Sequence, residues 1–174
     1  MTLEQLVKSK IRDVPDFPKP GILFKDITPL LQDSNSFHQV IHYFVNRYQN
    51  QKIDAVLGIE SRGFIFGAPL AYKLGTSFVP IRKEGKLPHK TINHSYTLEY
   101  GEAVIEMHVD AIRRGDRVVI VDDLLATGGT AEAACHLVEK QGGVVVECAF
   151  VVELGFLKGR EKIKNRDIVS LVCY

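Results

Sequence analysis

The fold is decided by the stretch Val118-Val119-Ile120-Val121-Asp122-Asp123-Leu124-Leu125-Ala126-Thr127-Gly128-Gly129-Thr130. Its first four residues are all β-branched, a composition typical of strands that are buried on both faces. Two adjacent carboxylates follow, and then a loop of small residues, hydroxyls and glycines that leads into a helical pattern. A buried strand that passes through such a turn into a helix indicates a parallel sheet. We therefore expect both acids and the glycine loop at the carboxyl end of one strand, where open α/β sheets bind ligands.

The rest of the chain repeats this alternation of strands and helices. A second strand-to-helix unit runs through Ser61-Arg62-Gly63, and Gly75 is its stop signal. An amphipathic helix is predicted from near Ser34 or Ser36, and a short one after Thr2. Further apolar runs predict strands at residues 53–59, 78–81, 144–152 and 168–172. The predicted fold class is α/β, an open and mostly parallel sheet with helices on both faces.

Length, charge and cysteine content limit the functions that need to be considered. The 174 residues make one domain, residues 1–174. A net charge of +1 offers no general attraction for nucleic acid or for an anionic membrane. No signal peptide and no apolar run of the roughly 20 residues that span a membrane is present. We expect a cytoplasmic protein whose three thiols pack as small core side chains: Cys135, Cys148 and Cys173.

Two segments interrupt the alternating pattern. Three prolines within residues 14–21 exclude a helix there and predict an ordered arm or a loop. Residues 82–106 are rich in charged and turn-forming residues with spaced aromatics. From composition alone this second segment is either a lid over the strand ends or a solvated hairpin.

The loop at residues 126–130 has the composition of an anion-binding cradle. Its glycines let backbone N–H groups close around a tetrahedral oxyanion at a helix N-terminus, and its threonine hydroxyls add donors. A P-loop is excluded, because GxxxxGK[ST] does not occur and the loop has no lysine. The carboxylates of Asp122 and Asp123 are acceptors that suit sugar hydroxyls or a cation-bound ligand. The alternative is that the acids cap the turn and the glycines only bend it.

This segment resembles the 5-phosphoribosyl 1-diphosphate (PRPP) signature of the type I phosphoribosyltransferases, most closely that of the members that use adenine. Further stretches resemble the same family in the same order: residues 17–29, 60–64, 81–88, 96–101 and 157–161. Together they cover nearly the whole chain. The resemblance implies the fold of that family, with residues 1–33 contributing a small N-terminal hood that binds the base and residues 82–106 a mobile, flexible catalytic loop.

The resemblance also implies a reaction, the Mg²⁺-dependent transfer of ribose 5-phosphate from PRPP to adenine, giving AMP and pyrophosphate. Asp122 and Asp123 would hold the ribose hydroxyls, while Ser61 and Arg62 would meet the pyrophosphate, for which the guanidinium fork is suited. The 5-phosphate would bind to Ala126, Thr127, Gly128, Gly129 and Thr130. No histidine pattern predicts a protein-held metal, so the Mg²⁺ would arrive with PRPP.

Residues of the 82–106 segment would complete the PRPP site. Arg82, Lys83 and Lys86 resemble basic residues that neutralise pyrophosphate in the family, some of them across a homodimer interface. Taken alone, such a run is equally a solvated face. Glu99 and Tyr100 match the mobile loop, in which the glutamate approaches the reacting centre. Proton transfer and charge compensation both stay open as the role of Glu99.

The choice of base rests on four residues by the same resemblance. Phe24 would lie against the purine ring, Leu157 on its opposite face, and the backbone of Leu23 and Lys25 at its edge. Phe24 is alternatively plain core, since its neighbours are apolar too. Lys25 stands where relatives often carry arginine, which puts any bidentate or stacked role of its side chain in doubt.

Other functions on the same fold are disfavoured. Hypoxanthine-guanine enzymes typically carry an aspartate where this chain has Ala126, so we expect a preference for adenine. Xanthine enzymes also carry alanine there, but the motifs around Phe24 and Leu157 argue against them. The alternative that is not an enzyme is a transcriptional regulator that senses PRPP or nucleotides on this fold. Such a protein needs a surface that binds DNA or RNA, and the balanced charge and short opening helix argue against one.

Overall fold

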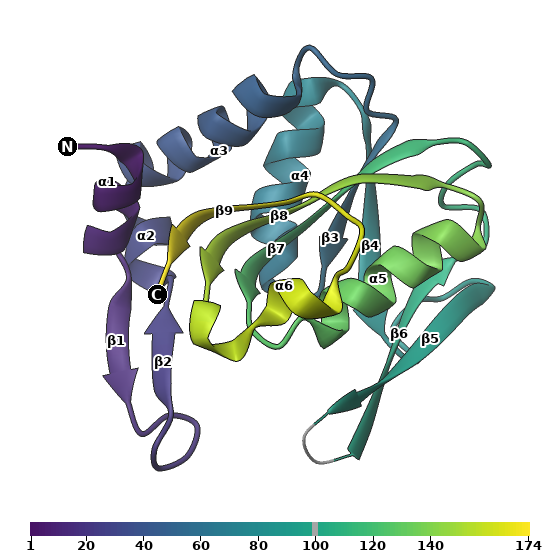
Figure 1. The fold of residues 1–174 in the computed structure, drawn as a ribbon. Helices are drawn as coiled ribbons and strands as arrows, with labels where there is room; N and C mark the ends of the chain where they lie inside the picture. The colour runs from purple at the N-terminus through teal and green to yellow at the C-terminus, as the bar shows by residue number, and fades with distance from the viewer. Residues whose placement is uncertain (99–100) are drawn as a thin grey trace.

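A seven-stranded sheet forms the centre of the molecule (Figure 1), and the computed structural model describes residues 1–98 and 101–174. The strand order is β5-β6-β4-β3-β7-β8-β9. All pairs from β4 to β9 along this order are parallel, whereas β6 pairs antiparallel with β4 and β5. The strands are β3 Ala55–Ile59, β4 Ser77–Lys83, β5 Thr91–Leu98, β6 Gly101–His108, β7 Arg117–Leu125, β8 Val144–Glu153 and β9 Ile168–Cys173. The predicted α/β class and mostly parallel sheet are confirmed.

Helices cover both faces of the sheet, because β7 alternates its side chains between two cores. Val119 and Val121 pack with residues of α3 and α4, while Val118 and Ile120 pack with residues of α5. The capping box predicted at Thr2 is present at the start of α1. The helices are α1 Leu3–Ser9, α2 Thr28–Gln32, α3 Ser34–Tyr48, α4 Arg62–Leu74, α5 Gly129–Lys140 and α6 Gly159–Lys162, with a 3₁₀ turn, η1, at Gly155–Leu157.

Two antiparallel ribbons flank the carboxyl ends of the parallel strands (Figure 1). One is a separate two-stranded sheet of β1, Arg12–Pro15, and β2, Leu23–Asp26. The other is the β5–β6 hairpin, which extends the main sheet through β6. Much of the segment 82–106 is therefore paired strand, a hairpin whose role as a lid stays a prediction. Its flexibility stays a prediction.

Two details differ from the sequence-based expectations. β7 continues through Leu125, so Asp122 and Asp123 lie inside a strand and not beyond its end. The reason is that β7 stays paired with β8 up to Leu125, whereas its pairing with β3 ends at Val121. Cys135 and Cys148 are buried as expected, but Cys173 is exposed, because it lies near the end of the edge strand β9.

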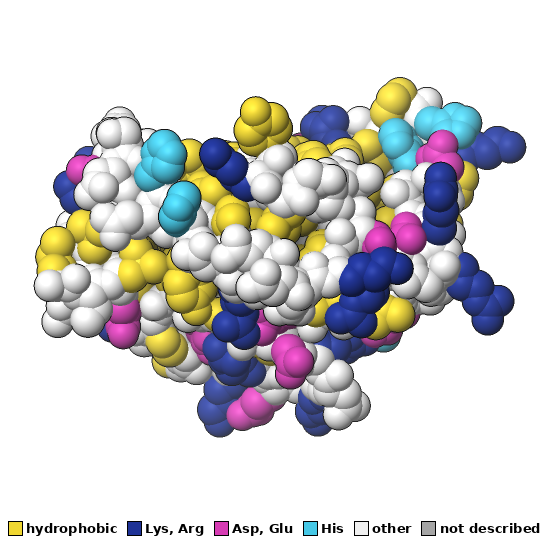
Figure 2. Space-filling model, turned by 90° about the horizontal axis from the view of Figure 1, so that it is seen from above, with side chains coloured by type: hydrophobic (Ala, Val, Ile, Leu, Met, Phe, Trp, Pro, Cys, Tyr) yellow, Lys and Arg dark blue, Asp and Glu magenta, His cyan; other side chains and the backbone are white. Residues whose placement is uncertain are grey.

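The surface agrees with a chain of nearly balanced charge. Figure 2 shows basic, acidic, histidine and apolar side chains interspersed over the face at the amino ends of the strands. Among the described residues, no helix is both long enough and apolar enough to cross a bilayer.

Candidate functional site

A cavity of about 70 Å³ lies where β7 turns into α5. Gly128 stands at the turn with a φ of +84°, a left-handed conformation that glycine adopts without strain. A Cβ at this position would lie 2.4 Å from the carbonyl oxygen of Gly159, so the loop packs directly on the start of α6. The cavity is lined by Asp122, Leu124, Leu125, Ala126, Thr127, Gly128, Gly129, Thr130, Ala131 and Phe150. All five residues of the predicted phosphate loop thus surround one cavity at a helix N-terminus.

The β5–β6 hairpin forms one wall beside this loop. The hydroxyl of Thr130 donates a hydrogen bond of 3.0 Å to the hydroxyl of Tyr96 in β5. The Tyr96 ring lies so close to Gly129 that a Cβ there would be 3.1 Å from Cδ2. Glu99 and Tyr100, predicted for the mobile loop, lie outside the described residues.

The two acids of β7 occupy different environments. Asp122 is partly buried and lines the cavity, and its Oδ1 accepts a hydrogen bond from the backbone N–H of Asp123. Burial raises the pKa of Asp122 well above its usual range, and the nearby charge of Asp123 raises it further. Burial also raises the pKa of Asp123, although the Arg62 guanidinium opposes that rise.

Asp123 has one unsatisfied oxygen. Its Oδ2 lies 3.0 Å from Nε of Arg62. The two groups are not aligned for a hydrogen bond, and within residues 1–98 and 101–174 this buried oxygen finds no hydrogen-bond donor. Arg62 offsets the charge of this oxygen, but its capacity to accept a hydrogen bond is unused among the described residues. The site is therefore prepared for a ligand that brings a donor, as a sugar hydroxyl does.

Arg62 contacts two of the other predicted site residues, Asp123 and Phe24. It is the first residue of α4, where Gly63 packs so tightly on β7 that a Cβ would lie 2.5 Å from the carbonyl oxygen of Val121. This contact places the Arg62 side chain between Asp123 and the ring of Phe24, whose centroid lies 5.4 Å from the guanidinium carbon. Arg62 thus connects α4 to the strand β7 and to the β1–β2 ribbon.

The other predicted pyrophosphate ligands are held by acids. Both Arg82 Nε and Nη2 donate to the carboxylate of Glu60, which lowers the pKa of Glu60. The backbone N–H of Lys83 donates to Glu60, and that of Lys86 donates to the buried Glu106. Ser61 follows a cis peptide bond and makes no capping hydrogen bond.

The residues predicted for the base lie on two separate segments. Phe24 is partly buried beneath Phe17, with ring centroids 5.1 Å apart, and Leu23 is exposed. Leu157 ends the turn η1 and is 38% exposed, so part of its apolar side chain is accessible to a ligand. Lys25 points away from Phe24 and is buried against Asp13.

Sequence reasoning missed several neighbours of the site. Tyr96 and Gly159 both lay inside stretches that matched the family, but neither had been given a role. Glu60 directly precedes the predicted Ser61 and Arg62. Its position beside Arg82 and Lys83 at the end of β4 follows only from the pairing of β4 with β3. Proximity to a motif was the only available signal for these residues.

Comparisons with known proteins show which family this chain resembles. Residues 26–173 match the family model of the phosphoribosyl transferase domain. An adenine phosphoribosyltransferase of Chloroflexus aurantiacus is 58% identical over 174 residues, which is all of both chains. A solved adenine phosphoribosyltransferase of Thermoanaerobacter pseudethanolicus superposes with a TM-score of 0.95 at 53% identity, covering 99% of this chain and 100% of that one. The adenine phosphoribosyltransferase of Saccharomyces cerevisiae was solved with adenine and an imino-altritol bisphosphate. It superposes with a TM-score of 0.92 at 42% identity, covering 97% of this chain and 98% of that one.

Proposed function

This chain belongs to the phosphoribosyltransferase family, among the adenine phosphoribosyltransferases, and we propose that the site at the end of β7 carries out its reaction. The reaction transfers 5-phosphoribose from PRPP to adenine and yields AMP and pyrophosphate, a step of purine salvage. The observation that carries the assignment of the site is the buried Oδ2 of Asp123, which has no hydrogen-bond donor among the described residues and directly follows the cavity-lining Asp122 in β7.

The phosphate and the ribose of PRPP bind along β7 in this proposal. The loop of residues 126–130 surrounds a cavity at the N-terminus of α5, where backbone N–H groups and the helix dipole attract an anion. Asp122 lines the same cavity, and Asp123 follows it in the strand. Ribose hydroxyls would donate to these carboxylates, which satisfies the buried oxygen of Asp123.

Arg62 lies at the junction where the bond to pyrophosphate breaks. The displacement builds positive charge on the ribose and negative charge on the leaving group, so it needs acceptors around the sugar and cations at the pyrophosphate. Arg62 contacts Asp123 on the sugar side and Phe24 on the base side. Its guanidinium can therefore turn to the pyrophosphate together with Ser61, while the acids stay on the ribose.

The basic residues of the hairpin region take the outer part of the pyrophosphate in this scheme. Lys83 and Lys86 use only their backbone groups in the hydrogen bonds to Glu60 and Glu106. Arg82 would have to exchange Glu60 for the ligand. Glu99 and Tyr100 would approach the reacting centre from the β5–β6 connection.

We propose that the reaction depends on Mg²⁺ that arrives with PRPP. When bound, the ion neutralises the developing charge on the pyrophosphate oxygens. The ion would keep water and phosphate oxygens as its ligands, while Asp122 and Asp123 hold the ribose hydroxyls. Asp122 and Asp123 thereby orient the ribose of the Mg²⁺-bound PRPP.

Base choice follows from the walls of the base site. Phe24 and Leu157 provide apolar surfaces for the two faces of a purine, and the backbone groups of Leu23 and Lys25 can pair with the amino edge of adenine. Ala126 has no group that could serve a 6-oxopurine. A site that pairs with one pattern of donors can reject the mismatched base by a factor of about 10⁴.

Oligomeric state and compartment are part of the same proposal. We propose a homodimer, and the exposed apolar side chains of Ile65 and Tyr72 on α4 offer a surface for it. Free thiols at Cys135, Cys148 and Cys173 support a reducing cytoplasm. Light scattering on the purified protein reports the oligomer directly, and a mass of one chain would exclude the dimer.

One assay tests the reaction and its metal dependence together. Purified protein is incubated with labelled adenine, PRPP and Mg²⁺, and AMP and pyrophosphate are measured, with hypoxanthine, guanine and xanthine in parallel. We expect AMP from adenine, loss of product with EDTA, and recovery with added Mg²⁺. Equal efficiency with hypoxanthine would disprove the base preference, and full activity in EDTA would disprove the metal dependence.

A further inference from the structure

Lys25 is an unusual lysine, because its side chain is only 8% exposed. It follows Phe24 in β2, and neighbouring strand residues point to opposite faces, so Phe24 turns toward Arg62 and Lys25 turns away. The Lys25 Nζ lies 2.6 Å from Oδ1 of Asp13 and 3.7 Å from the centroid of the Tyr174 ring. The buried ammonium is therefore held between a carboxylate and the face of an aromatic ring.

Tyr174 contacts a second segment through its backbone. Its N–H donates to the carbonyl of Glu153, and its carbonyl accepts from the N–H of Gly155, both at 2.9 Å. Gly155 begins the turn η1, which ends at Leu157. One residue thus contacts both segments to which the base-binding residues belong, β2 through its ring and η1 through its carbonyl.

This contact matters because β1–β2 is a sheet of its own. The ribbon has no strand pairing with the seven-stranded sheet, so side-chain contacts decide where it lies on the body. Figure 1 shows the end of β9 beside β2 and α2. Phe24 and Lys25 connect β2 to the body through their contacts with Arg62 and Tyr174.

We propose that Tyr174 is a positioning residue for the adenine site, an inference that rests on the function proposed above. Its aromatic face fixes Lys25, and thereby the β2 backbone at the edge of the base. Its carbonyl fixes the start of η1, and thereby Leu157. The ring of Tyr174 contacts Lys25 of β2, whereas the phosphate loop joins β7 to α5, so we expect loss of the ring to affect the binding of adenine and not that of PRPP.

The test removes the aromatic ring and keeps an apolar side chain at the position. Tyr174→Leu removes the aromatic face, and a cation–π contact of a buried ammonium corresponds to about a threefold to thirtyfold change in an equilibrium. We expect the KM for adenine to rise by about that factor, with kcat and the KM for PRPP within twofold of the parent. Tyr174→Phe is the matched control, because it keeps the ring and should keep the parent KM values.

A second pair of variants keeps the proposal testable if Tyr174→Leu folds poorly. Lys25→Met removes the ammonium and keeps the stem, and should raise the KM for adenine as Tyr174→Leu does. Lys8→Met is its control, since Lys8 Nζ lies 5.7 Å from the same ring but belongs to α1. Combining Lys25→Met with Tyr174→Leu should add little to either change, because both remove the same contact.

Several results would overturn the proposal. A parallel rise in the KM for adenine and for PRPP would show a general structural role for Tyr174. Equal effects of Tyr174→Phe and Tyr174→Leu would assign the role to the hydroxyl and not to the ring. An unchanged KM for adenine in both Tyr174→Leu and Lys25→Met would exclude positioning altogether. Failure of the parent protein to form AMP would instead refute the proposed function, so the two failures are distinguishable.

Discussion

At the scale of single residues, Asp123 shows how a binding site differs from a stable core. Its carboxylate is buried, one oxygen has no donor among the described residues, and Asp122 stands next to it. Such a group is unfavourable for folding. It becomes useful once a ligand supplies hydroxyl donors, so the cost in stability accompanies the capacity to bind a sugar.

Asp123→Asn tests this residue directly. The amide keeps the volume but replaces one acceptor oxygen by a donor NH₂ and removes the negative charge, so we expect kcat/KM for AMP formation to fall by about 100-fold. The melting temperature should stay level or rise, because the raised pKa of Asp123 means that the folded protein disfavours the charged carboxylate. Asp110→Asn, on an exposed turn, is the control. Activity within twofold of the parent would remove Asp123 from the site.

At the scale of elements, the β7–α5 loop depends on a glycine that is both left-handed and tightly packed. Gly128→Ala would place a Cβ 2.4 Å from the Gly159 carbonyl oxygen, so we expect the KM for PRPP to rise at least about tenfold. Gly75→Ala is a matched control: its φ is also positive, at +66°, but nothing lies within 4 Å of the new Cβ. That control should lose about 1 kcal/mol of stability and keep its KM values. An equal KM for PRPP in Gly128→Ala and Gly75→Ala would show that the loop still binds PRPP when the added Cβ displaces it from Gly159.

The contact between the β5–β6 hairpin and α5 predicts a pH dependence of stability. His94 of β5 stacks on His136 of α5, with ring centroids 4.8 Å apart. Burial lowers the pKa of His94, and the charges of His136 and Lys140 lower it further, while Glu132 opposes them. Glu132 and Glu139 both lie within 4.0 Å of His136.

The sign of this dependence follows from the lowered pKa. The unfolded chain binds a proton at His94 more readily than the folded protein does. The contribution of neutral His94 to the stability of the fold is therefore complete above a pH of about 6.5 and declines as the pH falls below it. Melting temperatures measured between about pH 8 and pH 5 should therefore fall, and His94→Gln should flatten the curve. An unchanged slope in that variant would exclude His94 as a source of the dependence.

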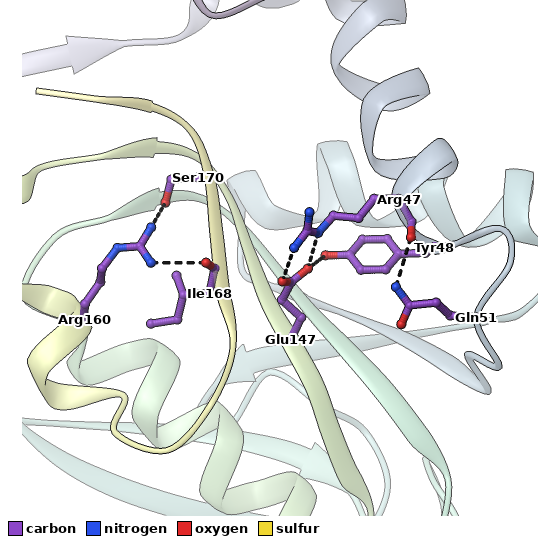
Figure 3. Close-up of polar contacts among 7 residues, drawn as sticks. All are labelled: Arg47, Tyr48, Gln51, Glu147, Arg160, Ile168 and Ser170. Atoms are coloured by element: carbon purple, nitrogen blue, oxygen red, sulfur yellow. Dashed lines mark hydrogen bonds and ion pairs between the residues drawn. The ribbon is translucent and has the colours of Figure 1, made fainter.

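At the scale of the whole molecule, ion pairs with buried carboxylates anchor the helices α3 and α6 to the sheet. Figure 3 shows Arg47 and Tyr48 of α3 on the carboxylate of Glu147 in β8. The register of β8 against β7 shifts by one residue just before Glu147, which turns this acid toward α3. Arg160 of α6 contacts Ser170 and the carbonyl of Ile168 in β9, and it also pairs with Glu153.

Glu147→Gln should separate stability from catalysis. The amide leaves Arg47 and the buried Tyr48 hydroxyl with a weaker acceptor, so we expect a loss of about 1–3 kcal/mol in the free energy of unfolding. The kcat and both KM values should stay within twofold, because Glu147 lies near the amino end of β8 and the site lies beyond its carboxyl end. Denaturant unfolding measures the loss, and a selective change in either KM would refute the separation.

Much of the fold followed from local pattern. The buried strand before Asp122, the helix from Ser34 and the stop at Gly75 all follow from side-chain periodicity and backbone preference. Both of these act over a few residues. The segment 82–106 was ambiguous, since the pairing of β5 with β6 depends on register, which composition does not reveal.

The sequence by itself determined the fold class, the family and the identity of the loop that surrounds the cavity, because each of these resides in contiguous residues. Only the tertiary structure decided that Arg62 lies between Phe24 and Asp123, that Glu60 holds Arg82, and that Lys25 turns to Tyr174. These contacts join residues far apart in the chain. They depend on where strands end and which way alternate side chains point, and both are settled only when the strands pair and the helices pack.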